Sequence, residues 1–181
     1  MRKVVVYELL SLDGAAEECQ EFVTEWDDVM DANLAAVIGP QDAVILGRRS
    51  HTEWAEFWQT SEIEPFSSFI NGVTKYVATS TPLTVDWPGS SVIDGDLVDF
   101  VRDLKQRPGG DIGVHGSISV AQTLLASDVV DELQLLVAPA LAEPGRRRLL
   151  DGLPAARFEL TNSVTSPSGY LLLAYRVLPA T

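Results

Sequence analysis

Two arginines lie where an apolar run ends and a helical pattern begins, in the segment LGRRS at residues 46–50. The first turn of a helix already carries partial positive charge, so cations are mildly unfavourable there unless an anion shares the site. Main-chain amides and guanidinium groups together hold phosphates well. The sequence therefore indicates an anion site, unless the arginines face solvent or pair with Asp42 or Glu53. The candidate residues are Gly47, Arg48, Arg49 and Ser50.

A second small-residue turn lies within residues 109–122, which read GGDIGVHGSISVAQ. Gly116 would let main-chain amides approach an oxygen closely. Ser117 could cap the following helix or donate to a phosphate. The segment lacks the GxGxxG pattern of dinucleotide-binding turns. Taken alone, it is more typical of a connector between a strand and a serine-capped helix.

Two further polar segments also follow apolar runs. Hydroxyls of Thr79 and Ser80, in TSTP at residues 79–82, could bind phosphate or simply form a turn. Asp13, in SLDG at residues 11–14, could contact a polar group of a substrate, assist its protonation or stabilise its own turn. Ligands of open α/β sheets gather beyond the carboxyl ends of the strands. We therefore expect the four segments to converge at one sheet edge.

Short β-branched runs alternate with helical patterns until about residue 138, and two alternating runs then form a hairpin around PSG at 167–169. This order predicts a three-layer α/β fold: a mostly parallel mixed sheet, helices on both faces and a C-terminal antiparallel hairpin. We expect one domain spanning residues 1–181. The predicted strands are 3–10, 43–46, 75–79, 91–93, 111–114, 132–138, 158–165 and 170–177. The predicted helices are 25–38, one around 54–58, 96–106 and 117–126, with loops at 15–24 and around Pro65.

The net charge of −13 argues against nucleic-acid or anionic-membrane partners, because such a surface repels phosphates. No stretch is long enough to span a bilayer. Cys19 is the single cysteine, which excludes an intrachain disulfide and is compatible with a cytoplasmic location. Two histidines and one thiol give no readable zinc site, so we expect no metal. The triplet at 146–148 reads as a solvated turn.

The order of these motifs resembles a known superfamily. SLDG, LGRRS, GDIGVHGS and then VDELQL at 130–135, followed by Ala138-Pro139, are similar to the reductase domain of the riboflavin-biosynthesis deaminase-reductase and its stand-alone relatives. These proteins share the dihydrofolate reductase fold. The resemblance covers nearly the whole chain, and VDEL with the later AP is its most specific part. Because no deaminase motif is present, the sequence resembles the short stand-alone branch.

The resemblance implies an NADPH site. It assigns the cofactor phosphates to Gly47, Arg48 and Arg49, with Ser50 beside them. Thr79 and Ser80 would lie near the adenosine ribose phosphate. The pyrophosphate would meet the turn and helix start at His115, Gly116, Ser117, Ile118 and Ser119. His115 stands where dihydrofolate reductases have a glycine, and Ile118 where some have an arginine. Use of NADH therefore stays open.

The expected function is NADPH-dependent hydride transfer to a small heterocycle of pterin or pyrimidine type. Asp13 is the candidate substrate contact and catalytic residue. A key acid of dihydrofolate reductases would lie on the helix at 25–38, with Asp27, Asp28 and Asp31 as unresolved candidates. The alternatives are a true dihydrofolate reductase and a nucleotide-binding protein without turnover. Because relatives commonly pair and the C-terminal strands offer an edge, we also expect a homodimer.

Overall fold

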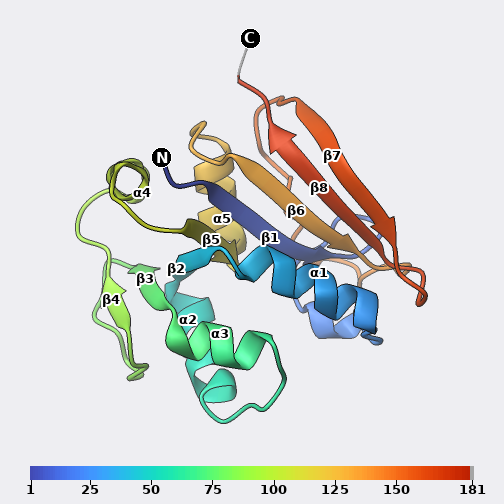
Figure 1. Cartoon of the computed structure of the whole chain (residues 1–181), viewed down its shortest axis with the longest axis horizontal. Coiled ribbons are helices and arrows are strands. Elements are labelled where there is room, and N and C mark those ends of the chain that lie inside the picture. The colour runs from blue at the N-terminus through green and yellow to red at the C-terminus, as the bar shows by residue number, and fades with distance from the viewer. Residues whose placement is uncertain (180–181) are drawn as a thin grey trace.

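The computed structural model describes residues 1–179 and contains one eight-stranded sheet in the order β4-β3-β2-β5-β1-β6-β8-β7. Figure 1 shows the sheet with the β7–β8 hairpin at one end. Neighbouring strands are parallel except at β8, which is antiparallel to both β6 and β7. The strands are β1 (Val4–Leu10), β2 (Gln41–Gly47), β3 (Thr74–Ala78), β4 (Ser90–Val92), β5 (Asp111–His115), β6 (Glu132–Val137), β7 (Phe158–Thr165) and β8 (Leu171–Val177). The predicted mixed sheet and hairpin are confirmed.

Helices cover both faces of the sheet because alternate residues of the central strand are apolar on both sides. Val4 and Val6 of β1 pack in one core with α4 and α5. Val5 and Tyr7 pack in the other with α1, α2 and α3. The helices are α1 (Asp28–Ile38), α2 (Arg48–Trp58), α3 (Phe66–Gly72), α4 (Leu97–Gln106) and α5 (Ile118–Leu125). Within the described residues, no helix combines the length and apolar character that a membrane crossing needs.

Two predicted loops contain short helical elements. The segment around Pro65 leads into α3, which buries Phe66 and Ile70. This helix is too short for a helical repeat of apolar residues to be recognised in the sequence. The predicted loop at 15–24 contains a 3-10 turn, Cys19–Glu21, with no buried residue. Helix α1 begins at Asp28, three residues later than predicted, because the Asp27 carboxylate accepts the N–H groups of Val29 and Met30.

Candidate functional site

A cavity of about 470 Å³ lies where β1, β2 and β5 end and α2 and α5 begin. Parallel strands that end at one edge leave such a crevice between their connecting loops. One wall is apolar and largely aromatic, and the rim is charged. The apolar wall comprises Leu9, Leu34, Trp54, Trp58, Ile63 and Phe66. The predicted convergence of segments 47–50 and 115–119 is therefore seen, since every residue of the two segments except Arg48 lines this cavity.

Three consecutive hydrogen bonds tie the starts of α2 and α5 together. The Gly47 N–H donates to Ser117 Oγ at 2.9 Å, Ser117 Oγ donates to Ser50 Oγ at 2.8 Å, and Ser50 Oγ donates to the Gly116 carbonyl at 2.8 Å. Ser117 thus precedes α5 without capping it by its side chain, contrary to one of our two interpretations. Its hydroxyl is used in positioning the turn. The main-chain N–H groups of the first turn of α5 have no partners within the helix. Ser117, Ile118 and Ser119 of this region line the cavity.

Gly116 allows the α5 turn to pack directly against the aromatic wall. Its φ is +59°, and a Cβ there would lie 2.3 Å from Cζ2 of Trp54. Trp54 in turn packs edge-on against Trp58 and Phe66, with ring centroids 6.3 and 5.6 Å away. Glycine is therefore required here both for the backbone conformation and for space. The close packing fixes the amides of the turn relative to the cavity wall.

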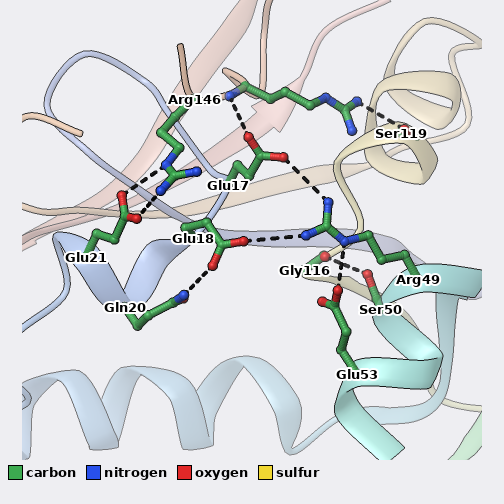
Figure 2. Close-up of polar contacts among 11 residues, drawn as sticks. Glu17, Glu18, Gln20, Glu21, Arg49, Ser50, Glu53, Gly116, Ser119 and Arg146 are labelled. Atoms are coloured by element: carbon green, nitrogen blue, oxygen red, sulfur yellow. Dashed lines mark hydrogen bonds and ion pairs between the residues drawn. The ribbon is translucent and has the colours of Figure 1, made fainter. Parts of the chain in front are cut away.

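Arg49 is surrounded by carboxylates (Figure 2). Its Nε donates to Glu53 at 2.8 Å, while the other guanidinium nitrogens lie 3.4 Å from Glu18 and 3.6 Å from Glu17. The Glu53 hydrogen bond is the main cause that raises the pKa of Arg49. The expected alternative pairing with Glu53 is thus present, although Arg49 also lines the cavity. Arg48 is exposed and lies outside the cavity lining, and Asp42 pairs with Arg2.

The arginine triplet at 146–148 does more than form the predicted solvated turn, because each of its members contacts the segment after β1 or the start of α5. The Arg147 guanidinium donates to Ser119 Oγ at 3.1 Å, and the Arg147 N–H donates to Glu17 at 3.3 Å. Arg146 pairs with Glu21, and Arg148 pairs with Asp13. Arg147 is therefore a second cation at the cavity. Sequence reasoning missed it, because it is brought to the α5 turn only by the path of the chain after β6.

Three buried polar atoms in cavity-lining residues have no hydrogen-bond partner within the described part of the chain: Tyr7 Oη, Glu8 Oε1 and His115 Nδ1. Burial raises the pKa of the Tyr7 hydroxyl and raises the pKa of Glu8 to about 8. The N–H groups of Ser117 and Gly116 act on the pKa of the Glu8 carboxyl in the opposite direction. The Tyr7 hydroxyl and the Glu8 carboxyl are consequently protonated at neutral pH.

His115 is held as a neutral ring. Its Nε2 lies 2.8 Å from Gln41 Oε1, and the Gln41 amide nitrogen donates to the Val37 carbonyl. Gln41 therefore accepts, Nε2 carries the proton, and Nδ1 is left as an acceptor. Burial lowers the pKa of His115 to about 3. The ring packs beside Phe66 and Phe69, so the residue that replaces the expected glycine is mainly a core residue.

The other two predicted segments lie outside this cavity. Thr79 and Ser80 line a separate hollow of about 670 Å³ beyond β3 and β4. Asp13 forms part of its own turn: it accepts from Ser11 Oγ at 2.7 Å and from the Ala142 N–H at 3.2 Å. The Ser11 hydrogen bond, followed by that of Ala142, holds the pKa of Asp13 below its ordinary value. Its role as a substrate contact remains a prediction.

The three acidic candidates of the α1 region have different positions. Asp27 caps the helix and also accepts the Ser168 N–H at 3.1 Å. Asp31 alone of the three lines the cavity, and its Oδ1 accepts the Trp26 indole N–H at 2.6 Å. Asp28 is absent from the cavity lining. The sequence showed no difference between these carboxylates because the cavity position depends on where α1 starts.

Residues 2–172 match the model of the family described as the RibD C-terminal domain. The chain is also 24% identical to the uncharacterized protein YyaP of Bacillus subtilis (strain 168), a match that covers 96% of this chain and 94% of YyaP. Both matches extend over almost the full described length.

Solved structures share the fold. A putative riboflavin biosynthesis protein from Shewanella sp. PV-4 superposes with a TM-score of 0.79 at 17% identity, covering 98% of this chain and 99% of that one. A pyrimidine reductase-like protein from Corynebacterium diphtheriae gives 0.74 at 16% identity, with coverage of 99% and 93%. The Thermotoga maritima diaminohydroxyphosphoribosylaminopyrimidine deaminase/5-amino-6-(5-phosphoribosylamino)uracil reductase gives 0.68 at 14% identity. That match covers 98% of this chain but 57% of the Thermotoga protein.

Proposed function

The chain belongs to the RibD C-terminal domain family, and from this premise we propose that it is an NADPH-dependent reductase of a small planar heterocycle. The observation that carries the proposal is the cavity itself. It joins an amide-lined turn and two arginines, which suit a phosphorylated cofactor, to an aromatic wall, which suits a planar ring. Reductases and pyrimidine reductase-like proteins among the structural neighbours support the same class.

The residues at the cavity fit a dinucleotide phosphate on two independent grounds. The N–H groups of Ile118 and Ser119 open α5, and the missing side chain of Gly116 lets the preceding turn pack against Trp54. Arg49 and Arg147 flank that turn and supply the local positive charge that the acidic surface lacks. The carboxylates around Arg49 compete for it, so phosphate binding requires that Arg49 exchange these partners for the ligand. Thr79 and Ser80 would hold the ribose phosphate in the second hollow.

A bound NADPH would supply a hydride to a C=N or C=O carbon of the substrate, and the substrate nitrogen or oxygen would gain a proton from solvent. The chain's own residues bind and orient the ring. Trp54, Trp58 and Phe66 provide flat apolar contact. Asp31 supplies a carboxylate at the α1 side of the cavity, where it can accept from a ring N–H of a pterin or pyrimidine.

Titration with NADPH tests the cofactor claim, since quenching of the tryptophans that line the cavity should report binding. Absence of binding at millimolar NADPH would refute it. Loss of NADPH absorbance with a panel of pterins, pyrimidines and flavin precursors then tests turnover. Preference for dihydrofolate with inhibition by methotrexate would favour a true dihydrofolate reductase. Binding without turnover on any member of the panel would favour a nucleotide-binding protein.

We also propose that the protein is a homodimer through the β7 edge. Strand β7 is exposed along most of its length, and Leu160 and Val164 are 51% and 37% exposed. An unpaired, partly apolar edge strand is a favourable surface for association with a second copy. Light scattering at micromolar protein should give twice the chain mass. A monomer mass would contradict the proposal.

A further inference from the structure

Glu8 is a buried carboxyl beneath the turn that leads into α5, and the family assignment gives it no role. It lies on β1, where its neighbour Tyr7 is in register with His115 of β5, so Glu8 reaches the level of Gly116. The residue is 3% exposed and lines the cavity, and its Oε1 has no hydrogen-bond partner among the described residues. A buried polar atom without a partner is costly, so a ligand that supplied the partner would gain from it.

The Glu8 carboxyl and a bound phosphate would meet the same donors. The N–H groups of Gly116 and Ser117 act on Glu8, and these amides belong to the turn to which we assign the cofactor pyrophosphate. Two anions at one pair of amides repel each other strongly in a site shielded from water. A carboxylic acid does not repel the phosphate, and its O–H is a donor that a phosphate oxygen accepts.

Building on the proposed function, we propose that Glu8 is a positioning residue for the cofactor phosphate. Its carboxyl acts as the neutral acid and donates to a phosphate oxygen that also accepts from the α5 turn. Because the ionised form of Glu8 excludes the phosphate, binding is coupled to the proton on this carboxyl. Burial, which raises the pKa of Glu8 to about 8, keeps that proton in place at neutral pH.

The groups around Glu8 indicate that its own proton is the one coupled to phosphate binding. The segment after β1 contributes a thiol, Cys19, whose pKa is raised by its own burial and then by the charge of Glu8. His115 of β5 is neutral, since burial lowers its pKa to about 3. The other cavity-lining residues with charged side chains are Glu17, Glu18, Asp31, Arg49, Glu53, Glu64 and Arg147. Arg49 pairs with Glu17, Glu18 and Glu53, and Arg147 contacts Ser119.

The test is the dissociation constant of NADPH between about pH 7.5 and 9.5, a range above the second phosphate pKa of about 6. For the wild-type chain we expect a constant value up to about pH 8 and a rise of up to about tenfold per pH unit above it. Glu8→Gln keeps the donor and cannot ionise. It should bind as tightly as the wild type at pH 7.5 and show no such rise.

Calorimetry in two buffers of different ionisation enthalpy measures the proton directly. At pH 8.5 the wild-type chain should take up about three quarters of a proton per NADPH, and Glu8→Gln none, because a group with a pKa of about 8 is mostly ionised there. Cys19→Ser is the matched control and should retain the uptake. Lys75, whose pKa burial lowers to about 8, is common to all three proteins and drops out of the comparison.

The outcomes separate the two proposals. Failure of NADPH to bind at any pH would overturn the proposed function and the role of Glu8 together. NADPH binding with the same pH dependence in wild type and Glu8→Gln would overturn the role of Glu8 and leave the reductase proposal standing. Loss of the proton uptake in Cys19→Ser would assign the proton to the thiol and would likewise overturn it.

Discussion

Gly116→Ala should lower the free energy of unfolding by more than a glycine-to-alanine substitution elsewhere that causes backbone strain but no steric clash. At φ +59° an L-residue adopts the left-handed conformation, at about 1–2 kcal/mol. The new Cβ would also lie 2.3 Å from Trp54, and overpacking of this kind costs about 1–3 kcal/mol. Trp54 cannot easily move aside, since Trp58 and Phe66 pack against it. The total expected loss is about 2–5 kcal/mol.

Gly145→Ala provides the matched control. Gly145 has φ +91°, and a Cβ added there would meet no atom within 4 Å, so this variant measures the backbone cost alone. Reduction of unfolded-chain entropy favours alanine equally in both variants. Urea unfolding followed by circular dichroism should show Gly116→Ala less stable than Gly145→Ala by about 1–3 kcal/mol. Thermal midpoints should differ by several degrees, at about 2–4 °C per kcal/mol for a chain of this size. Equal losses in the two variants would refute the packing of the α5 turn against Trp54.

Three further outcomes are expected. Arg49→Gln should weaken NADPH binding about tenfold or more in fluorescence titrations, because a charge-assisted hydrogen bond contributes about 1.5–3 kcal/mol; Arg102→Gln, at an exposed ion pair of α4, should leave it unchanged. Glu18→Gln should tighten NADPH binding by about 1.5- to fivefold at low salt, because an exposed ion pair worth about 0.2–1 kcal/mol no longer competes for Arg49; an effect that high salt does not reduce would argue against this electrostatic cause. Burial lowers the pKa of His115 from 6.5 to about 3, so the unfolded chain alone takes up this proton as the pH falls below 6.5. His115→Gln should abolish that part of the acid destabilisation, up to about 2 kcal/mol at pH 5 in urea unfolding, and an unchanged pH profile would contradict it.

The strands and the positions of the turns before α2 and α5 could be predicted from sequence, because burial and turn chemistry leave local patterns. The α5 turn was found in this way through Gly116 and Ser117. The hydrogen bonds of the Ser117 hydroxyl could not be predicted, because its partners Gly47 and Ser50 lie 70 and 67 residues away in the sequence. Local sequence contains no signal for such a pairing.

The missed residues have a similar cause. Glu8 reads as an interruption in an apolar strand, and only the placement of the α5 turn above it shows that its carboxyl is buried at the cavity. Arg147 reads as one of three basic residues, and only the fold distinguishes it by its contact with Ser119. Asp13 was singled out by its position after β1, and the structure shows that its side chain accepts from Ser11 and from the Ala142 N–H. Its contact with a substrate stays a prediction.

The central position of β1 has a consequence for how the chain folds. Val4 pairs with Ile112 of β5 and Val5 pairs with Glu132 of β6. Strand β1 can therefore pair with its neighbours only after most of the chain has been synthesised. Contacts between residues so far apart in sequence slow folding, because the loop between them must close before they are formed. During synthesis, the apolar strand that will later form the centre of the sheet therefore remains without partners until β5 emerges. Apolar strands without partners promote aggregation, so β1 is exposed to that risk during this interval.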